Sequence, residues 1–175
     1  MERLSILGST GSIGVQTLDI VRRNPERFSV TSLVAHSRWQ ELAAQAREFG
    51  VERVVIGDER HYAALKETLA DTSVEVMAGG DAIVDVARDN RCDTVVNALV
   101  GYSGLHPTYA AIEAGKRIAL ANKETLVVGG DVTLLTDYEI KASIKVENIV
   151  TLDLNGNTLT GNIICSTMSR RCTYN

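Results

Sequence analysis

The sequence predicts an α/β protein built on a doubly wound, mostly parallel β-sheet. Over residues 3–121, short apolar runs typical of buried strands alternate with segments whose apolar residues recur at helical spacing. A glycine-rich turn, Gly8–Gly14, joins the first apolar run to the first helical segment. Parallel strands joined by helices need crossover connections, which we expect to be right-handed.

Apolar runs bounded by glycine, proline or polar residues predict strands over residues 3–7, 28–35, 53–56, 74–77, 92–98 and 117–121. Helical spacing predicts helices over residues 15–23, 39–49, 59–70 and 105–114, and one more that Asp81 caps. Asn24-Pro25 ends the first helix, because proline disfavours helical conformation at the residue before it.

The composition is that of a soluble globular protein. The chain has 175 residues, 45% hydrophobic and 23% charged, which is enough for one domain with a buried core. A net charge of −4 disfavours nucleic-acid binding, which needs a basic surface. No apolar run reaches the roughly 18 residues of a membrane span, so we expect no membrane partner.

Cysteine usage and the start of the chain predict a cytoplasmic location. Cys92, Cys165 and Cys172 are an odd set without a C-x-x-C pair, as expected of reduced thiols. The first strand begins almost at Met1, which leaves no room for a signal or transit peptide.

The turn Gly8–Gly14 predicts a phosphate-binding site. The free N–H groups of a first helical turn, with the helix dipole, attract an anion. Gly8 suits a strained turn and Gly11 allows close approach of a diphosphate, while Ser12 is the expected N-cap. The spacing G-x-x-G-x-x-G differs from the usual dinucleotide motif G-x-G-x-x-G, and an ordinary turn between strand and helix is the alternative.

The end of the second strand favours NADP(H) over NAD(H). An NAD site usually places an acidic residue here, to accept hydrogen bonds from the ribose 2′-hydroxyl. This chain has His36-Ser37-Arg38, so no carboxylate repels a 2′-phosphate and Arg38 can bind one. The alternative is that Arg38 is solvated at a helix start and that His36 has no role.

Two further polar segments follow predicted strands, at the edge of the sheet where ligands bind. The loop Leu99–Gly104 is placed to flank the cofactor, or is a plain connector. Asn122-Lys123-Glu124 follows the last strand: Lys123 offers a positive charge for a phosphate and Asn122 both donates and accepts hydrogen bonds. Helix capping is the alternative for this segment.

Four segments in order resemble the N-terminal, NADPH-binding domain of 1-deoxy-D-xylulose 5-phosphate reductoisomerase over residues 1–130. They are the glycine turn at 8–14, Arg22-Arg23-Asn24-Pro25, Val-Gly-x-x-Gly at 100–104 and Ala-Asn-Lys-Glu at 121–124. The resemblance implies a Rossmann-like domain and an NADPH-dependent oxidoreductase. The family converts 1-deoxy-D-xylulose 5-phosphate to 2-C-methyl-D-erythritol 4-phosphate, in the non-mevalonate route to isoprenoids, with a divalent metal that holds the substrate oxygens.

The resemblance also implies roles for individual residues. Those that bind the phosphates of NADPH are Thr10, Gly11, Ser12 and Ile13. His36, Ser37 and Arg38 occupy the region that receives the 2′-phosphate, where the family often has Gly-Lys/Arg/Ser-Asn. Asn122 and Glu124 correspond to cofactor contacts, and Lys123 corresponds to a contact with the phosphorylated sugar substrate. No catalytic residue is assigned.

Residues 131–175 do not resemble the family and are predicted to form a divergent segment, a β-hairpin or a partly disordered tail. The family's metal-binding motif Pro-Val-Asp-Ser-Glu-His is not found, so no ligand for Mg²⁺ or Mn²⁺ is assigned. Asn155-Gly156-Asn157 is a hairpin signal that would join strands near Leu152 and Leu159. A truncated, frame-shifted or fused gene would explain this tail.

The preferred function is therefore the NADPH-binding part of a reductoisomerase, which we expect to be inactive alone and which resembles proteins that form homodimers. An NADP-linked semialdehyde dehydrogenase is one alternative, and it requires a nucleophilic cysteine in an activating site. A non-catalytic nucleotide-binding module is the other.

Overall fold

The computed structural model describes residues 1–121, together with the backbone of six short strands at 132–133, 138–139, 144–146, 152–153, 159–160 and 163–165. The chain divides into two compact units, Met1–Ala121 and Asn122–Asn175. The predicted division at residue 130 stays a prediction. None of the helices among the described residues could span a lipid bilayer.

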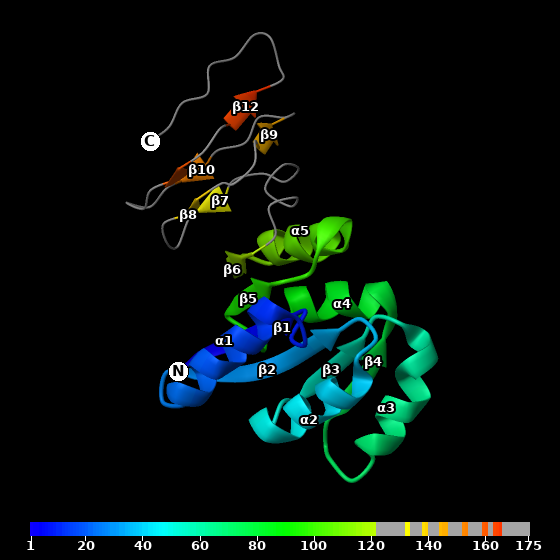
Figure 1. Cartoon of the computed structure of the whole chain (residues 1–175). Coiled ribbons are helices and arrows are strands. Elements are labelled where there is room, and N and C mark those ends of the chain that lie inside the picture. The colour runs from blue at the N-terminus through cyan, green and yellow to red at the C-terminus, as the bar shows by residue number, and fades with distance from the viewer. Residues whose placement is uncertain are drawn as a thin grey trace. The chain divides into compact units, whose positions relative to one another are not determined.

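The first unit is built on a six-stranded parallel sheet (Figure 1). Its strands are β1 (Glu2–Leu7), β2 (Phe28–Ala35), β3 (Arg53–Ile56), β4 (Glu75–Ala78), β5 (Thr94–Asn97) and β6 (Arg117–Leu120). The order across the sheet is β4-β3-β2-β1-β5-β6. The direction of strand addition therefore reverses beside β1, and the carboxyl ends of β1 and β5 flank the switch point where ligands bind in such sheets.

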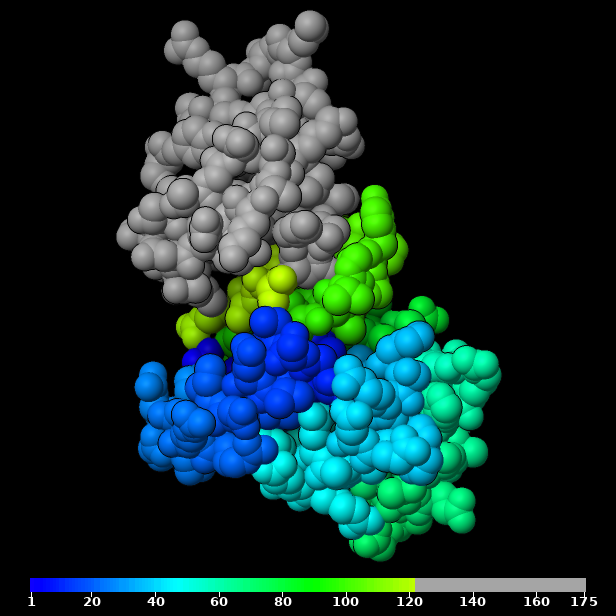
Figure 2. All heavy atoms as spheres, in the orientation of Figure 1, coloured from blue at the N-terminus to red at the C-terminus, as the bar shows by residue number. Residues whose placement is uncertain are grey.

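Helices cover both faces of this sheet, as the predicted fold class requires (Figure 1). The α-helices are α1 (Ser12–Arg23), α2 (Trp39–Phe49), α3 (Tyr62–Thr68), α4 (Gly79–Arg88) and α5 (Leu105–Glu113). Short 3₁₀ turns, η1 (Glu59–His61) and η2 (Gly101–Gly104), precede α3 and α5. Figure 2 shows the face of the unit that α1 and α2 cover.

Alternation along the strands divides the core into two layers. Ile6, Leu33 and Val54 point to the layer that contains Leu18 of α1 and Leu42 of α2. The next residue of each strand, Leu7, Val34 and Val55, belongs to the layer that contains residues of α4 and α5. Because both faces are buried, these strands are apolar throughout rather than alternating with polar residues.

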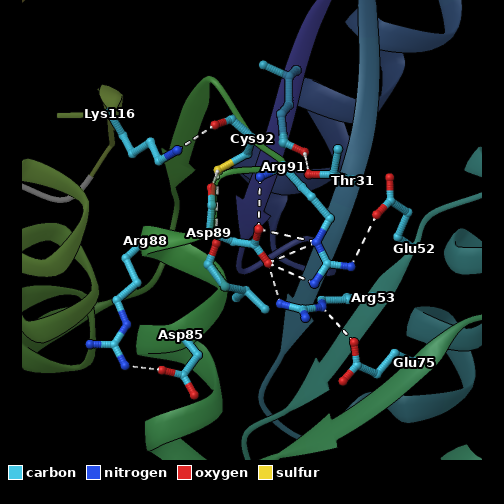
Figure 3. Close-up of polar contacts among 12 residues, drawn as sticks. Thr31, Glu52, Arg53, Glu75, Asp85, Arg88, Asp89, Arg91, Cys92 and Lys116 are labelled. Carbon is cyan, nitrogen blue, oxygen red and sulfur yellow. Dashed lines mark hydrogen bonds and ion pairs between the residues drawn. The ribbon is translucent and has the colours of Figure 1, made fainter. Parts of the chain in front are cut away.

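The amino ends of the strands are joined by ion pairs. Arg3 of β1 contacts Asp93 before β5 (Nη2–Oδ1 2.6 Å), and Arg53 of β3 contacts Glu75 of β4 (Nε–Oε2 2.7 Å). Asp89 lies between Arg53 and Arg91 (Figure 3). These contacts fix the edge of the sheet opposite to the switch point.

Several predicted boundaries are wrong at the helix starts. Helix α1 begins at Ser12 with Gly11 as its N-cap, so Ser12 is not the cap, and no side chain caps the helix. Helix α4 begins at Gly79, and Asp81 lies in its first turn instead of capping it. In both cases glycines occupy the first turn or the N-cap position. Because glycine disfavours helix interiors, helix propensity does not predict where these helices begin.

In the second unit, the described strands pair in parallel. Strand β10 (Leu152–Asp153) pairs with β7 (Val132–Thr133), and β12 (Ile163–Cys165) pairs with β9 (Ile144–Val146). Strand β11 (Leu159–Thr160) pairs with β8 (Tyr138–Glu139). The strands on either side of the predicted hairpin turn thus pair elsewhere and not with each other.

Candidate functional site

The turn between β1 and α1 lies at the switch point of the sheet. Gly8 adopts φ +88°, a left-handed conformation that side chains rarely allow. A Cβ on Gly8 would lie 2.8 Å from the carbonyl oxygen of Ala98, directly after β5. Glycine is therefore needed at this position both for the backbone angle and for the close approach of the two loops.

Gly14 and Gly11 complete the turn for different reasons. A Cβ on Gly14 would lie 2.3 Å from the carbonyl oxygen of Gly8 and 2.6 Å from Cα of Ser9, so only glycine lets α1 pack on the turn. At Gly11 a Cβ would meet only the carbonyl oxygen of Gly8, at 3.3 Å. The outer side of the turn is thus open at Gly11, where a diphosphate would approach.

The residues predicted to hold phosphate follow directly. Thr10 is buried, whereas Ser12 and Ile13 are exposed at the first turn of α1. The first N–H groups of an α-helix have no partner within the helix, and Gly11 has no side chain to cap them. The turn therefore offers backbone donors, the positive end of the helix dipole and adjacent hydroxyl groups, which together fit a diphosphate.

Asn97, the last residue of β5, holds the loop on the other side of the site. Its fully buried amide donates to the carbonyl of Gly104 (2.9 Å) and to Oγ1 of Thr108 (2.6 Å), and its Oδ1 accepts from the N–H of Leu99 (3.1 Å). The loop that touches Gly8 is thus fixed at both ends by one side chain. The sequence prediction placed this loop beside the cofactor but did not identify Asn97.

His36, Ser37 and Arg38 are exposed at the carboxyl end of β2, next to the turn in the sheet order. The Arg38 guanidinium contacts Glu41 (Nη1–Oε2 3.3 Å), and both side chains are more than half exposed. A carboxylate in the first turn of α2 therefore partly neutralises the predicted 2′-phosphate cation, which the sequence prediction did not consider.

Gln45 of α2 is a further residue that the sequence prediction missed. Its Nε2 donates to the carbonyl oxygen of Ser9 in the turn (3.1 Å). Its Oε1 and the Ser9 hydroxyl are buried without a hydrogen-bond partner in the described part of the chain. The turn is thus held from α2 as well as from the β5 loop.

The second predicted segment, Asn122, Lys123 and Glu124, lies outside the described residues. The preceding residue, Ala121, donates its N–H to the carbonyl of Asn97 (3.0 Å), so the chain leaves the sheet at the edge that bears the glycine turn. Within the described residues, no group of three or more His, Cys, Asp or Glu could hold a metal ion.

Cys92 does not have the environment of a nucleophile. It is buried before β5, and its thiol lies 3.3 Å from the carbonyl oxygen of Asp89 (Figure 3). Burial raises the pKa of the Cys92 thiol. A reactive cysteine needs the opposite, because the thiolate is the nucleophile. This finding counts against a semialdehyde dehydrogenase that would use Cys92.

The family described as 1-deoxy-D-xylulose 5-phosphate reductoisomerase matches residues 4–130. The chain belongs to this family. The match covers the glycine turn, the β5 loop and the Asn122–Glu124 segment, and the resemblance noted from the sequence is confirmed.

Curated relatives with this description share about 50% sequence identity with this chain over the matched part. The relative from Desulfitobacterium hafniense is 49% identical over 144 residues, which are 82% of this chain and 38% of the relative. The relative from Bacteroides fragilis is 51% identical over 130 residues, 74% of this chain and 34% of the relative. The chain thus spans little more than a third of the length of these relatives.

Solved structures agree in fold. The 1-deoxy-D-xylulose 5-phosphate reductoisomerase of Zymomonas mobilis, in complex with NADPH, matches with a TM-score of 0.69 and 45% identity over 72% of this chain and 33% of that one. A structure of DOX-P reductoisomerase in complex with NADPH, fosmidomycin and magnesium matches with a TM-score of 0.70 and 42% identity over 73% of this chain and 31% of that one. The predicted doubly wound α/β fold is confirmed.

Proposed function

We propose that residues 1–130 form the NADPH-binding domain of a 1-deoxy-D-xylulose 5-phosphate reductoisomerase. The observation that carries the proposal is the turn Gly8–Gly14, which is open at Gly11 and packed against α1 and the β5 loop. Two similar structures were solved with NADPH, which supports the choice of ligand.

In this proposal, the β1–α1 turn binds the diphosphate of NADPH. The backbone N–H groups of Ser12 and Ile13 donate to the phosphate oxygens, Gly11 lets the diphosphate approach the backbone, and the hydroxyl groups of Thr10 and Ser12 add donors. The end of β2 binds the adenosine side, where Arg38 recognises the 2′-phosphate beside His36 and Ser37. When bound, NADPH supplies the hydride for the reduction.

Beyond β6, we propose that Asn122 and Glu124 contact the cofactor and that Lys123 binds the phosphorylated sugar. Lys123 would act as a point charge for the phosphate or a substrate oxygen. A similar structure was solved with fosmidomycin and magnesium. We propose that a full-length protein with this domain isomerises and reduces 1-deoxy-D-xylulose 5-phosphate to 2-C-methyl-D-erythritol 4-phosphate, with Mg²⁺ or Mn²⁺. We further propose that it acts in the cytoplasm as a homodimer.

The direct test is titration of residues 1–175 with NADPH and with NADH by calorimetry. We expect binding of NADPH and an affinity for NADH at least roughly tenfold lower, since the 2′-phosphate adds a charged contact. Arg38→Ala is expected to reduce this preference. Equal affinities for the two nucleotides, or binding of neither, would contradict the proposal.

A second measurement separates binding from catalysis. Oxidation of NADPH is followed with 1-deoxy-D-xylulose 5-phosphate and Mg²⁺ or Mn²⁺. We expect no turnover from these residues alone, because the metal-binding motif Pro-Val-Asp-Ser-Glu-His is not among them. Clear turnover would show that residues 131–175 contribute metal ligands of another kind.

A further inference from the structure

An ion pair at the carboxyl end of β3 has no part in the site described so far. Asp58 accepts from Nε of Arg60 (2.9 Å to Oδ1) and from its Nη2 (2.6 Å to Oδ2). The Asp58 side chain is only 12% exposed, whereas that of Arg60 is 86% exposed. The carboxylate is thus held under the arginine, whose guanidinium faces solvent.

This pair lies directly beside the segment predicted to receive the 2′-phosphate. The N–H of Asp58 donates to the carbonyl of His36 at 2.7 Å, and the N–H of Gly57 donates to the carbonyl of Ala35 at 2.8 Å. A Cβ on Gly57 would lie 3.0 Å from Nδ1 of His36. The ends of β2 and β3 therefore lie side by side, and Arg38 follows the first strand while Arg60 follows the second.

Arg60 offsets a negative charge beside the predicted 2′-phosphate site, that of the Asp58 carboxylate. Alone, the Asp58 carboxylate would repel a 2′-phosphate bound at His36–Arg38, as the acidic residue of an NAD site does. Arg60 contacts both oxygens of that carboxylate, and His61 lies 3.8 Å from it. The hydrogen bonds from Arg60 hold the pKa of Asp58 well below its usual range, so the carboxylate stays charged and stays paired.

Arg60 also retains donors for a ligand. A guanidinium has five N–H groups in a planar fork, and two of its nitrogens, Nε and Nη2, face Asp58. In the described part of the chain, Nη1 makes no hydrogen bond or ion pair. One edge of the side chain therefore covers the acid while another is open to a phosphate.

We propose that Arg60 is a specificity-determining residue for NADPH, which binds the 2′-phosphate together with Arg38 and covers the charge of Asp58. This inference rests on the proposed function. It assigns the preference for NADPH to two strand ends instead of one.

The test compares dissociation constants for NADPH and NADH in the full chain by calorimetry. For Arg60→Ala we expect the constant for NADPH to rise roughly tenfold, because a charged contact is lost and the Asp58 carboxylate is uncovered. The constant for NADH should stay the same or fall. Arg60→Ala combined with Asp58→Asn should recover part of the NADPH affinity, because the repelling charge is then gone.

Arg47→Ala is the matched control. Arg47 also pairs with an aspartate, Asp71 (Nη1–Oδ2 3.0 Å), but lies in the last turn of α2, at the other end of that helix from Arg38. We expect it to leave both constants unchanged. If the parent chain binds no NADPH, the proposed function fails. If the parent chain prefers NADPH and Arg60→Ala keeps the same preference, this inference alone is overturned.

Discussion

Single side chains hold the backbone of this site in place from several sides. Gln45 donates to the carbonyl of Ser9 in the glycine turn, and Asn97 makes three hydrogen bonds that fix the loop after β5. Neither residue belongs to a recognisable motif. Their importance follows from burial and from the hydrogen bonds that their partners would lose.

Asn97→Ala is expected to destabilise the fold by about 2–3 kcal/mol, because it leaves the part-buried N–H of Leu99 and the buried hydroxyl of Thr108 with one partner fewer. Urea unfolding followed by circular dichroism measures this change. Asn90→Ala, at an exposed residue, is the control and should lie within about 0.5 kcal/mol of the parent chain. Equal effects of the two substitutions would contradict the role given to Asn97.

Glu41→Gln is expected to strengthen NADPH binding by about twofold, because it removes the carboxylate that contacts Arg38 at an exposed site. The constant for NADH should not change, since NADH lacks the 2′-phosphate. Glu48→Gln is the control: Glu48 lies on α2 like Glu41 but is one of two carboxylates that pair with Arg22 of α1. Weaker NADPH binding by the Glu41 variant would mean that Glu41 itself positions Arg38.

At the scale of elements, the β1–α1 turn shows what the sequence could and could not predict. The bounds predicted for β2, α2 and β3 are confirmed, because apolar strands and a helix closed by Gly50 give clear signals. The start of α1 was missed by three residues, because Gly14 lies inside the first turn. Gly14 is needed there because the carbonyl of Gly8 leaves no room for a Cβ, which agrees with the packing role of the third glycine in such turns.

Gly14→Ala is expected to cost at least about 2 kcal/mol of stability and to abolish NADPH binding, because the new Cβ would overlap the carbonyl oxygen of Gly8 and push α1 off the turn. Thermal unfolding and nucleotide titration measure both effects. The control is Gly80→Ala in the first turn of α4, where a Cβ would meet nothing within 4 Å. That variant should be unchanged or slightly more stable, by up to about 1 kcal/mol.

Only part of the candidate site could be predicted from the sequence. The glycine turn and Arg38 could be found because they follow strands directly in the sequence. Asp58, Arg60 and Asn97 also follow or end strands, but their significance depends on which strand ends are neighbours. That order, β4-β3-β2-β1-β5-β6, emerges only from the tertiary structure.

Across the whole unit, the two edges of the sheet, at the amino and the carboxyl ends of the strands, carry different features. Ion pairs close the amino edge, where Arg3 contacts Asp93 and Arg117 contacts Glu2 (Nη1–Oε1 2.6 Å). The carboxyl edge carries the turns that form the site. The ion pairs of the amino edge can therefore be removed by substitution without touching the turns of the candidate site.

Asp93→Asn is expected to lower stability at neutral pH and to have progressively less effect as the pH falls below about 4. Hydrogen bonds from Arg3 hold the pKa of Asp93 far below its usual value, so its contribution is complete above the unfolded-state pKa and is lost as the pH falls toward the native one. Urea midpoints measured from pH 7 to pH 2 test this. A difference between the two proteins that stays constant over this range would contradict it.

The central position of β1 has a consequence for synthesis of the protein on the ribosome. Strands β2, β3 and β4 are added on one side of β1, and its other side is paired only by β5, about ninety residues later in the chain. Until Thr94–Asn97 has left the exit tunnel, the nascent chain exposes an unpaired edge beside Gly8. The loop after β5, which packs against Gly8, therefore completes the proposed nucleotide site late in synthesis.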